Sequence, residues 1–445
     1  MTHRYIALLL SGILLTTYFS EEKGRAVEMK ESTAKEISRE GNITKLELEN
    51  GLIVLLEENH SAPVTAVNVW VKVGSACERE DEAGLAHVHE HMVFKGTSRH
   101  GVGEIARIIE AHGGDINAFT SFDQTVYHIV IASRFLDTAL DILSDAMENA
   151  LFDPQELEKE LEVVLEEIRR GEDIPSRQLS ERLFSAAYTH HPYRRPIIGY
   201  RETVKGFTRE KVMDFYKRWY APNNVVLVVV GDFDTPRIIP RIKETFGVLK
   251  SKPLPKCVDE KEPPQDKTRA FVFDKNVQEG YFALAFHIPN LMHEDIPAID
   301  VLSSILGGGE SSRLYRQVKE EKGLVTSIYS YAFTPKYPGI FMVGGTLDPE
   351  KASQTLSEVI KEAYRLKYEP VDYEELSRAK INIESDSVYA KETAQGQAQR
   401  IGYFEVVAGD YRYEGEYLKR VLQVSREDIL RIANKYLSQV LVCNP

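Results

Sequence analysis

Three residues in one short stretch, His87, Glu90 and His91, have the types and the spacing to bind a metal ion and to move a proton. On a helix, His87 and His91 are one turn apart, and Glu90 lies between them on the same face. Two imidazoles at this short separation can ligate one metal ion, while the neighbouring carboxylate exchanges protons. The pattern H-x-x-E-H is typical of zinc hydrolases and is the inverse of the commoner H-E-x-x-H, which would need a histidine in place of Val93. The stretch therefore predicts a catalytic site with one Zn²⁺ per chain.

A third metal ligand is needed, because zinc in hydrolases takes three protein ligands and keeps its fourth position open. A helix predicted over residues 154–170 offers six carboxylates, which are Glu156, Glu158, Glu160, Glu162, Glu166 and Glu167. Periodicity alone does not select among them, since a carboxylate-rich helix is usually a solvated face. The residues by themselves leave the third ligand open.

The elements that must position this site predict an α+β fold. Residues 64–73 alternate as a long strand directly before the histidines. Residues 251–268 hold four prolines and many charges, which is typical of a linker. The order of strands and helices before this linker is echoed after it. We therefore expect two homologous α/β sandwich-like domains, each a sheet plus helices: an N-terminal domain with the zinc site over 44–250 and a C-terminal domain without metal over 269–445.

Composition bounds the class of protein. A chain of 445 residues is too long for one compact core, and 43% hydrophobic with 28% charged residues describes a folded protein rather than a disordered one. The net charge is −13 and no basic run occurs, which argues against binding of nucleic acid.

The first residues predict export. Residues 6–19 are nearly all apolar, which is short for a membrane span but fits the apolar part of a secretory signal. We expect residues 1–26 to be a signal peptide or an uncleaved signal anchor, with the chain in the periplasm or facing the periplasmic or extracellular side of a membrane; a buried helix is the alternative. Residues 20–43 read as a charged, loose segment.

Three cysteines, Cys77, Cys257 and Cys443, are far apart and lack metal-ligand spacing. One bridge and three separate thiols are equally compatible with that count.

Four motifs together resemble a known family. The stretches GLAHVHEHMVFKGT, GGDINAFTSFDQTVYH, EKELEVVLEEI and HPYRRPIIGY are similar to those of the pitrilysin (inverzincin) zinc peptidases. The resemblance is closest to the branch that contains mitochondrial processing peptidase and its bacterial relatives, and it covers about residues 44–440. It implies a fold in which the chain forms one half of a clam shell. It also implies that Glu167 is the third ligand and that Glu160, seven residues earlier, supports the site.

The same resemblance implies a zinc endopeptidase that acts on peptides or unfolded segments inside a closed chamber. Glu90 would take a proton from water and pass it to the leaving amine. A peptide substrate would lie as an added strand against Asn117, Ala118 and Phe119. The helical angle places His89 on the side of its helix away from the metal.

One departure from the family affects the expected partner. Active members place an Arg, and seven residues later a Tyr, after the Gly-rich stretch of the other half. This chain has Lys319 and Thr326 there, and neither can replace the planar guanidinium or the phenol. We therefore expect a heterodimer with a homologous partner subunit that supplies the Arg/Tyr pair. The alternative is a non-catalytic structural or assembly subunit with the same fold, and retention of the metal-site residues argues against it.

Overall fold

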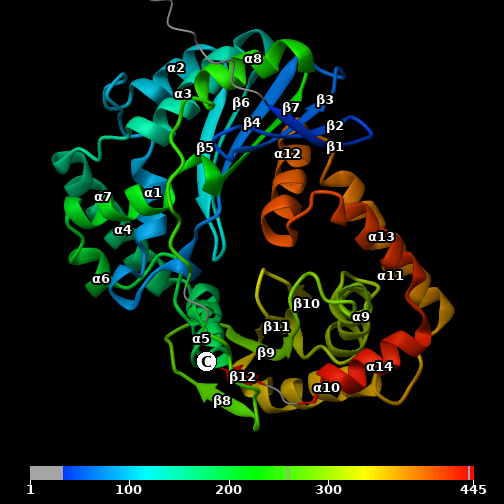
Figure 1. Cartoon of the computed structure of the whole chain (residues 1–445). Coiled ribbons are helices and arrows are strands. Elements are labelled where there is room, and N and C mark those ends of the chain that lie inside the picture. Colours follow the sequence, from blue (N-terminus) through cyan, green and yellow to red (C-terminus); the bar gives the residue numbers. More distant parts are fainter. Residues whose placement is uncertain (1–33, 258–259, 439–440, 445) are drawn as a thin grey trace, which may run out of the picture. The chain divides into compact units, whose positions relative to one another are not determined.

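The computed structural model describes residues 34–257, 260–438 and 441–444, so the predicted leader at 1–26 lies outside the described residues. Thr33–Pro445 forms one compact unit. Within it the chain builds two mixed sheets with helices packed against them, which confirms the α+β expectation (Figure 1).

The first sheet has seven strands in the order β1-β2-β3-β7-β4-β6-β5. Their bounds are β1 (Lys35–Glu40), β2 (Ile43–Glu47), β3 (Ile53–Glu58), β4 (Val64–Val71), β5 (Asp115–Thr120), β6 (Thr125–Ala132) and β7 (Val225–Gly231). Strands β3 and β7 run parallel, and every other neighbouring pair is antiparallel. The expectation of a loose segment up to residue 43 is wrong for β1. Its charged residues form an exposed edge strand that pairs with β2. The two strands are joined by a tight turn in which Gly41 has φ 57°.

Residues of this sheet alternate between its two faces, and helices pack against both faces. Val67, Val69 and Val71 of β4 point into the larger core, whereas Ala66 and Trp70 point to the opposite face. The helices of this half are α1 (Leu85–Met92), α2 (Glu104–Ala111), α3 (Leu136–Asn149), α4 (Pro154–Asp173), α5 (Pro175–Ala187), α6 (Arg201–Lys205), α7 (Arg209–Trp219) and α8 (Thr235–Thr245). The opposite face packs against α12 (Ala394–Tyr403), which comes from the second half of the chain.

The second sheet repeats the topology of the first. Its order is β10-β11-β9-β12-β8, with β8 (Arg269–Val272), β9 (Gly280–Ile288), β10 (Val325–Phe333), β11 (Gly339–Leu347) and β12 (Leu441–Asn444). Strand for strand this matches β5-β6-β4-β7-β3, and the single parallel pair falls at the same place. The two halves are therefore copies of one unit, as the echoed element order predicts, while the exact domain bounds stay a prediction.

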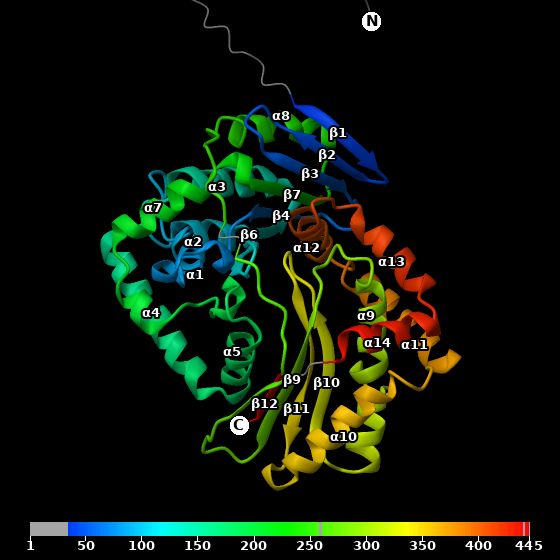
Figure 2. The same cartoon turned by 60° about the horizontal axis from the view of Figure 1, so that its bottom comes forward.

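The second sheet also has helices on both faces (Figure 2). One face carries α9 (Ile296–Gly307), α10 (Ala352–Arg365), α11 (Tyr373–Tyr389), α13 (Tyr413–Gln423) and α14 (Arg426–Tyr436), and the other packs against α5. Among the described residues, every helix is too short or too polar to cross a bilayer.

Two hairpin turns join the halves directly. Asp123, in the turn between β5 and β6, is buried and accepts hydrogen bonds from the Tyr193 hydroxyl at 2.8 Å. The same carboxylate accepts a hydrogen bond at 3.1 Å from the backbone N–H of Lys336, which lies in the turn between β10 and β11. The edge hairpins of both sheets therefore meet at one carboxylate.

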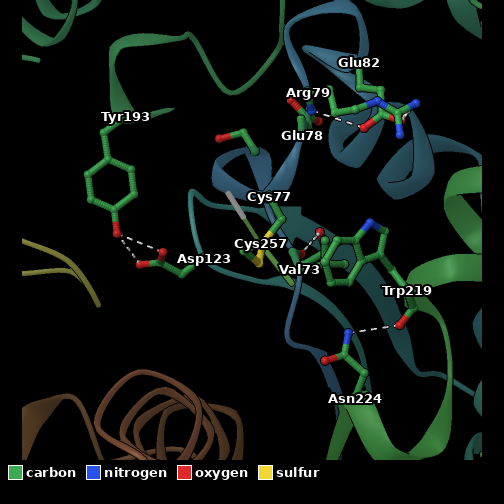
Figure 3. Close-up of a disulfide and its surroundings, with 12 residues drawn as sticks. Val73, Cys77, Glu78, Arg79, Glu82, Asp123, Tyr193, Trp219, Asn224 and Cys257 are labelled. Atoms are coloured by element: carbon green, nitrogen blue, oxygen red, sulfur yellow. Dashed lines mark hydrogen bonds and ion pairs between the residues drawn. A yellow bond between two sulfur atoms is a disulfide. The ribbon is translucent and has the colours of Figure 1, made fainter. Parts of the chain in front are cut away.

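The predicted linker carries no helix or strand in its described part, 251–257 and 260–268, yet it is fastened at two points. Cys257 forms a disulfide with Cys77, with a Cα–Cα distance of 4.5 Å (Figure 3). The Glu262 carboxylate accepts backbone N–H bonds from three successive residues, Thr189, His190 and His191, at 2.8–3.0 Å. Of the two cysteine alternatives, the single bridge is therefore correct.

Replacing Cys257 by Ser is expected to lower the free energy of unfolding by about 2–4 kcal/mol, because the bridge closes a loop between residues 180 positions apart. Chemical denaturation without reductant measures this. Adding reductant should bring the wild type to the level of the variant and leave the variant unchanged. Equal stability of the two proteins without reductant would contradict the expectation.

Candidate metal centre

A buried carboxylate fixes the start of α1, the helix that carries the two histidines. Glu78 accepts hydrogen bonds from the backbone N–H groups of Gly84 at 2.9 Å and Ala86 at 2.7 Å, and so satisfies free donors of the first turn. Burial raises the pKa of Glu78 to about 8, and the two N–H donors oppose that rise. Gly84 has φ 104°, and a Cβ there would lie 2.6 Å from the carbonyl oxygen of Ile198. A glycine is therefore required where the chain enters α1.

The inner face of α1 locks the helix into the core. Leu85, Val88 and Met92 are fully buried. His89 lies on this face with its ring between Phe215 and Tyr220, 4.9 and 5.4 Å between centroids. Burial lowers the pKa of His89 to about 4, and hydrogen bonds to the backbone carbonyls of Leu85 and Val212 oppose that fall. His89 thus faces away from the other two histidines, as the helical angle predicts.

Two helices bring the predicted metal ligands together. Glu167 of α4 places Oε2 at 3.7 Å from Nε2 of His87 and at 3.8 Å from Nε2 of His91. One ligand atom from each of the three residues lies within 4.8 Å of the others, and no other such group of three occurs among the described residues. Donors on a tetrahedral zinc ion are about 3.4 Å apart, given bonds of roughly 2.0–2.1 Å. The two distances from Glu167 are a few tenths of an ångström above this spacing, and the full set of three donors would have to draw together from within 4.8 Å to bind the ion.

The protonation states also suit a cation. Burial, with the nearby His91 and Arg177 adding to it, lowers the pKa of His87 to about 3, so its ring is neutral and Nε2 can offer a lone pair. The Glu160 carboxylate can only accept, so Nδ1 of His91, at 3.2 Å, carries the hydrogen and leaves Nε2 free. The Nδ1 atom of His87 is buried and has no hydrogen-bond partner among the described residues.

Glu160 contacts His91 of the predicted metal site and also Lys95. Besides His91, it contacts Nζ of Lys95 at 2.5 Å. Lys95 lies three positions after the end of α1, and the sequence motifs did not single it out. A carboxylate that fixes the ring of a metal-binding histidine is a common arrangement around protein metal sites.

Glu90 stands beside the three donors without being one of them. Its Oε2 atom is 4.0 Å from Nε2 of His87. Burial raises the pKa of the Glu90 carboxyl group, and hydrogen bonds from Thr120 of β5 oppose that rise. A half-buried carboxylate with a raised pKa next to a cation site is suited to accepting and returning a proton.

The three predicted substrate-binding residues lie on β5, at the edge of the first sheet. Asn117 is exposed, and Ala118 and Phe119 are half-buried. Strand β5 is paired with β6 on one side, and it packs against α1. An edge strand beside the metal site is the geometry needed to add a peptide as a further strand.

Lys319 and Thr326 make local contacts. Nζ of Lys319 lies 4.5 Å from the centre of the Tyr315 ring, and the Thr326 hydroxyl donates to Glu279 at 3.0 Å. Both belong to the second half, on the π-helical segment Tyr315–Glu321 and on β10. Neither of these two contacts involves a residue of the predicted metal site.

A separate cavity of about 990 Å³ lies among α9, α11, α12 and α13, and Asp300 lines it. Burial raises the pKa of Asp300 to about 7, against a hydrogen bond from the Tyr417 hydroxyl. Because the folded pKa exceeds the ordinary value of 3.8, the protonated form is favoured in the folded state, and stability falls as pH rises from the lower value to the higher one.

The variant Asp300→Asn removes this pH dependence. Relative to the variant, the wild type is expected to lose about 2 kcal/mol of unfolding free energy between about pH 5 and about pH 8. Denaturant titrations at the two pH values measure the difference. Asp386→Asn, in the same cavity, is the control. A constant difference between wild type and Asp300→Asn would contradict the assignment.

Comparison with known proteins identifies the family. The profile described as Insulinase (Peptidase family M16) matches residues 53–201, and the profile described as Peptidase M16 inactive domain matches residues 206–383. An uncharacterized zinc protease of Rickettsia felis is 31% identical over 400 residues, covering 90% of this chain and 95% of that protein. The chain therefore belongs to peptidase family M16, which confirms the resemblance carried by its motifs.

Solved structures agree with this membership. The crystal structure of a protease from Helicobacter pylori is similar with a TM-score of 0.86 and 30% identity, covering 90% of this chain and 98% of that one. The periplasmic protease PqqL from Escherichia coli shares the fold with a TM-score of 0.78 at 19% identity. This chain covers 48% of the PqqL chain, so it spans about half of that protein.

Proposed function

We propose that the chain is a zinc-dependent endopeptidase that hydrolyses peptides or unfolded protein segments, with one Zn²⁺ held by His87, His91 and Glu167. The observation that carries this proposal is the convergence of two imidazoles from α1 and one carboxylate from α4, with Glu90 beside them. Membership of family M16 supports it, as do relatives that are named zinc proteases.

Each residue of the site has a defined task in this proposal. Zinc, when bound, lowers the pKa of a water molecule and polarises the scissile carbonyl. Glu90 accepts the proton of that water and delivers it to the leaving amine, which requires Glu90 to be ionised at the start. Glu160 holds the His91 ring through Nδ1 and so keeps Nε2 directed at the site. The edge of β5 binds the peptide through its backbone, so that cleavage depends little on sequence.

A homologous partner subunit would complete the enzyme. Lys319 and Thr326 replace the Arg/Tyr pair that the family resemblance implies, and their side chains are held by Tyr315 and Glu279. The half-length coverage of PqqL is compatible with a second unit of the same fold. The expected heterodimer therefore pairs this zinc-bearing chain with a metal-free chain that supplies the missing pair.

Export to an oxidising compartment is part of the proposal. The apolar residues 6–19 favour secretion, as a cleaved signal peptide or as a membrane anchor. The disulfide between Cys77 and Cys257 supports it, because such bridges persist in the periplasm and outside the cell.

The alternative is a non-catalytic structural or assembly subunit. Lys319 and Thr326 favour it, because they stand where active members have the Arg/Tyr pair. One experiment separates the two functions. The purified full chain is assayed for zinc content and for turnover of an unstructured peptide, alone and with a candidate partner chain. One zinc per chain with turnover, alone or in the pair, supports the peptidase. Metal-free protein, or zinc without turnover in either setting, rejects it.

A further inference from the structure

An arginine that the motif analysis did not single out contacts the third predicted metal ligand. Helices α4 and α5 are separated only by Ile174, and Arg177 lies in the first turn of α5. Its Nη1 atom is 3.6 Å from Oε1 of Glu167, and its Nε atom is 3.4 Å from Oε1 of Glu181. The sharp corner at Ile174 therefore places the guanidinium group of Arg177 beside Glu167.

The two oxygens of Glu167 face different groups. Oε2 is the atom near Nε2 of His87 and His91, whereas Oε1 is the atom near Arg177. A carboxylate can ligate zinc through one oxygen or through both. A guanidinium group that engages the outer oxygen leaves one oxygen for the metal.

Gly171 gives Arg177 its room. It lies four residues after Glu167 on α4, so both are on one face of the helix. A Cβ at Gly171 would lie 2.7 Å from Nε and 2.9 Å from Cζ of Arg177, closer than such atoms approach. Glycine inside a helix is less favourable than alanine by about 1 kcal/mol. The close approach of the guanidinium group is compatible with a glycine, and not with a larger residue, at position 171.

We propose that Arg177 is a positioning residue that holds the outer oxygen of Glu167 so that only Oε2 is presented to the zinc ion, and that Gly171 makes this contact possible. The inference rests on the proposed metal site. The side chains of Glu167 and Arg177 are 39% and 31% exposed. Because exposed ion pairs contribute little to folding, the effect belongs to the geometry of metal binding and not to stability.

Three variants test the proposal on the full chain loaded with Co²⁺ in place of zinc. Gly171→Ala keeps every charge, favours the helix and displaces the end of the Arg177 side chain. Arg177→Gln removes the guanidinium, and Arg177→Lys keeps the charge with a single donor group. Arg169→Gln is the matched control, because Arg169 is an arginine of α4 that binds Glu166 at 2.6 Å. Visible absorption reports the coordination number, since four-coordinate Co²⁺ absorbs more strongly than five-coordinate Co²⁺.

The wild type and Arg169→Gln are expected to show four-coordinate Co²⁺. Gly171→Ala and Arg177→Gln are expected to shift toward five-coordinate spectra, as the second oxygen of Glu167 joins the ion. Their zinc dissociation constants, measured by chelator competition, should rise about tenfold, and Arg177→Lys should recover part of the loss. Thermal melting should show Gly171→Ala at least as stable as the wild type.

Wild-type spectra and wild-type zinc affinity in both Gly171→Ala and Arg177→Gln would overturn the positioning role while leaving the proposed function intact. Tighter zinc binding in these variants would overturn it as well, because that result would show simple charge repulsion between Arg177 and the ion. A wild-type chain that binds neither metal would overturn the metal site and the inference together.

Discussion

Glu90→Gln protein is expected to retain one zinc per chain and to lose peptide turnover by about 10³–10⁴-fold. Gln has nearly the same shape as Glu but cannot accept a proton at neutral pH. The three donors that would hold zinc, on His87, His91 and Glu167, are untouched, and Glu90 is not one of them. The effect should therefore appear in kcat with little change in metal content.

Zinc analysis and peptide hydrolysis on the same preparation measure this pair of results. Glu110→Gln, an exposed glutamate of α2, serves as the control and should behave as the wild type. Unchanged turnover in Glu90→Gln would remove Glu90 from the proton transfer. Loss of zinc from that variant would instead place Glu90 among the ligands.

The second large effect is expected on metal affinity. Glu167→Gln should weaken zinc binding by more than about 100-fold, because it replaces an anionic ligand by a neutral amide, and changes to outer residues alone reach that size. Turnover at limiting zinc should fall in parallel. Chelator competition measures the dissociation constant directly.

The neighbouring residue provides a matched control for Glu167. Glu166 lies on the same helix, but its carboxylate binds Arg169 and Arg170 at 2.6 and 3.3 Å. Glu166→Gln should therefore bind zinc as the wild type does. Equal zinc affinity of Glu167→Gln and Glu166→Gln would show that α4 does not supply the third ligand.

The local geometry of the site was predictable because it depends on one helix. The spacing of His87, Glu90 and His91 places them on one face of any helix they form. The structure has this helix, α1. The third ligand, a carboxylate from α4, was not predictable from spacing in this way. Glu160 and Glu167 are two turns apart in a helix rich in glutamates, and only the packing of α4 beside α1 distinguishes them. The motif resemblance assigns roles to both residues, because similarity to a family carries information about tertiary contacts that periodicity does not.

Arg177 and the disulfide were beyond sequence reasoning for the same reason. Arg177 reaches Glu167 only because Ile174 alone separates α4 from α5, and the polar letters of α5 did not predict that helix or its direction. The partner of Cys77 lies 180 residues away, and the pairing depends on the path of the linker over the first half of the chain. The strand β1 was missed because its charged residues are typical of an exposed edge.

The bridge between Cys77 and Cys257 bears on how the protein is produced in the laboratory. Material made in a reducing bacterial cytoplasm would have two thiols in its place, next to Glu78, the residue that caps α1. Such preparations would lack the constraint of the bridge, so their stability and activity would not represent the disulfide-bonded protein. Secretion into the periplasm of the expression host, or oxidative refolding, is the appropriate route to samples for every assay described above.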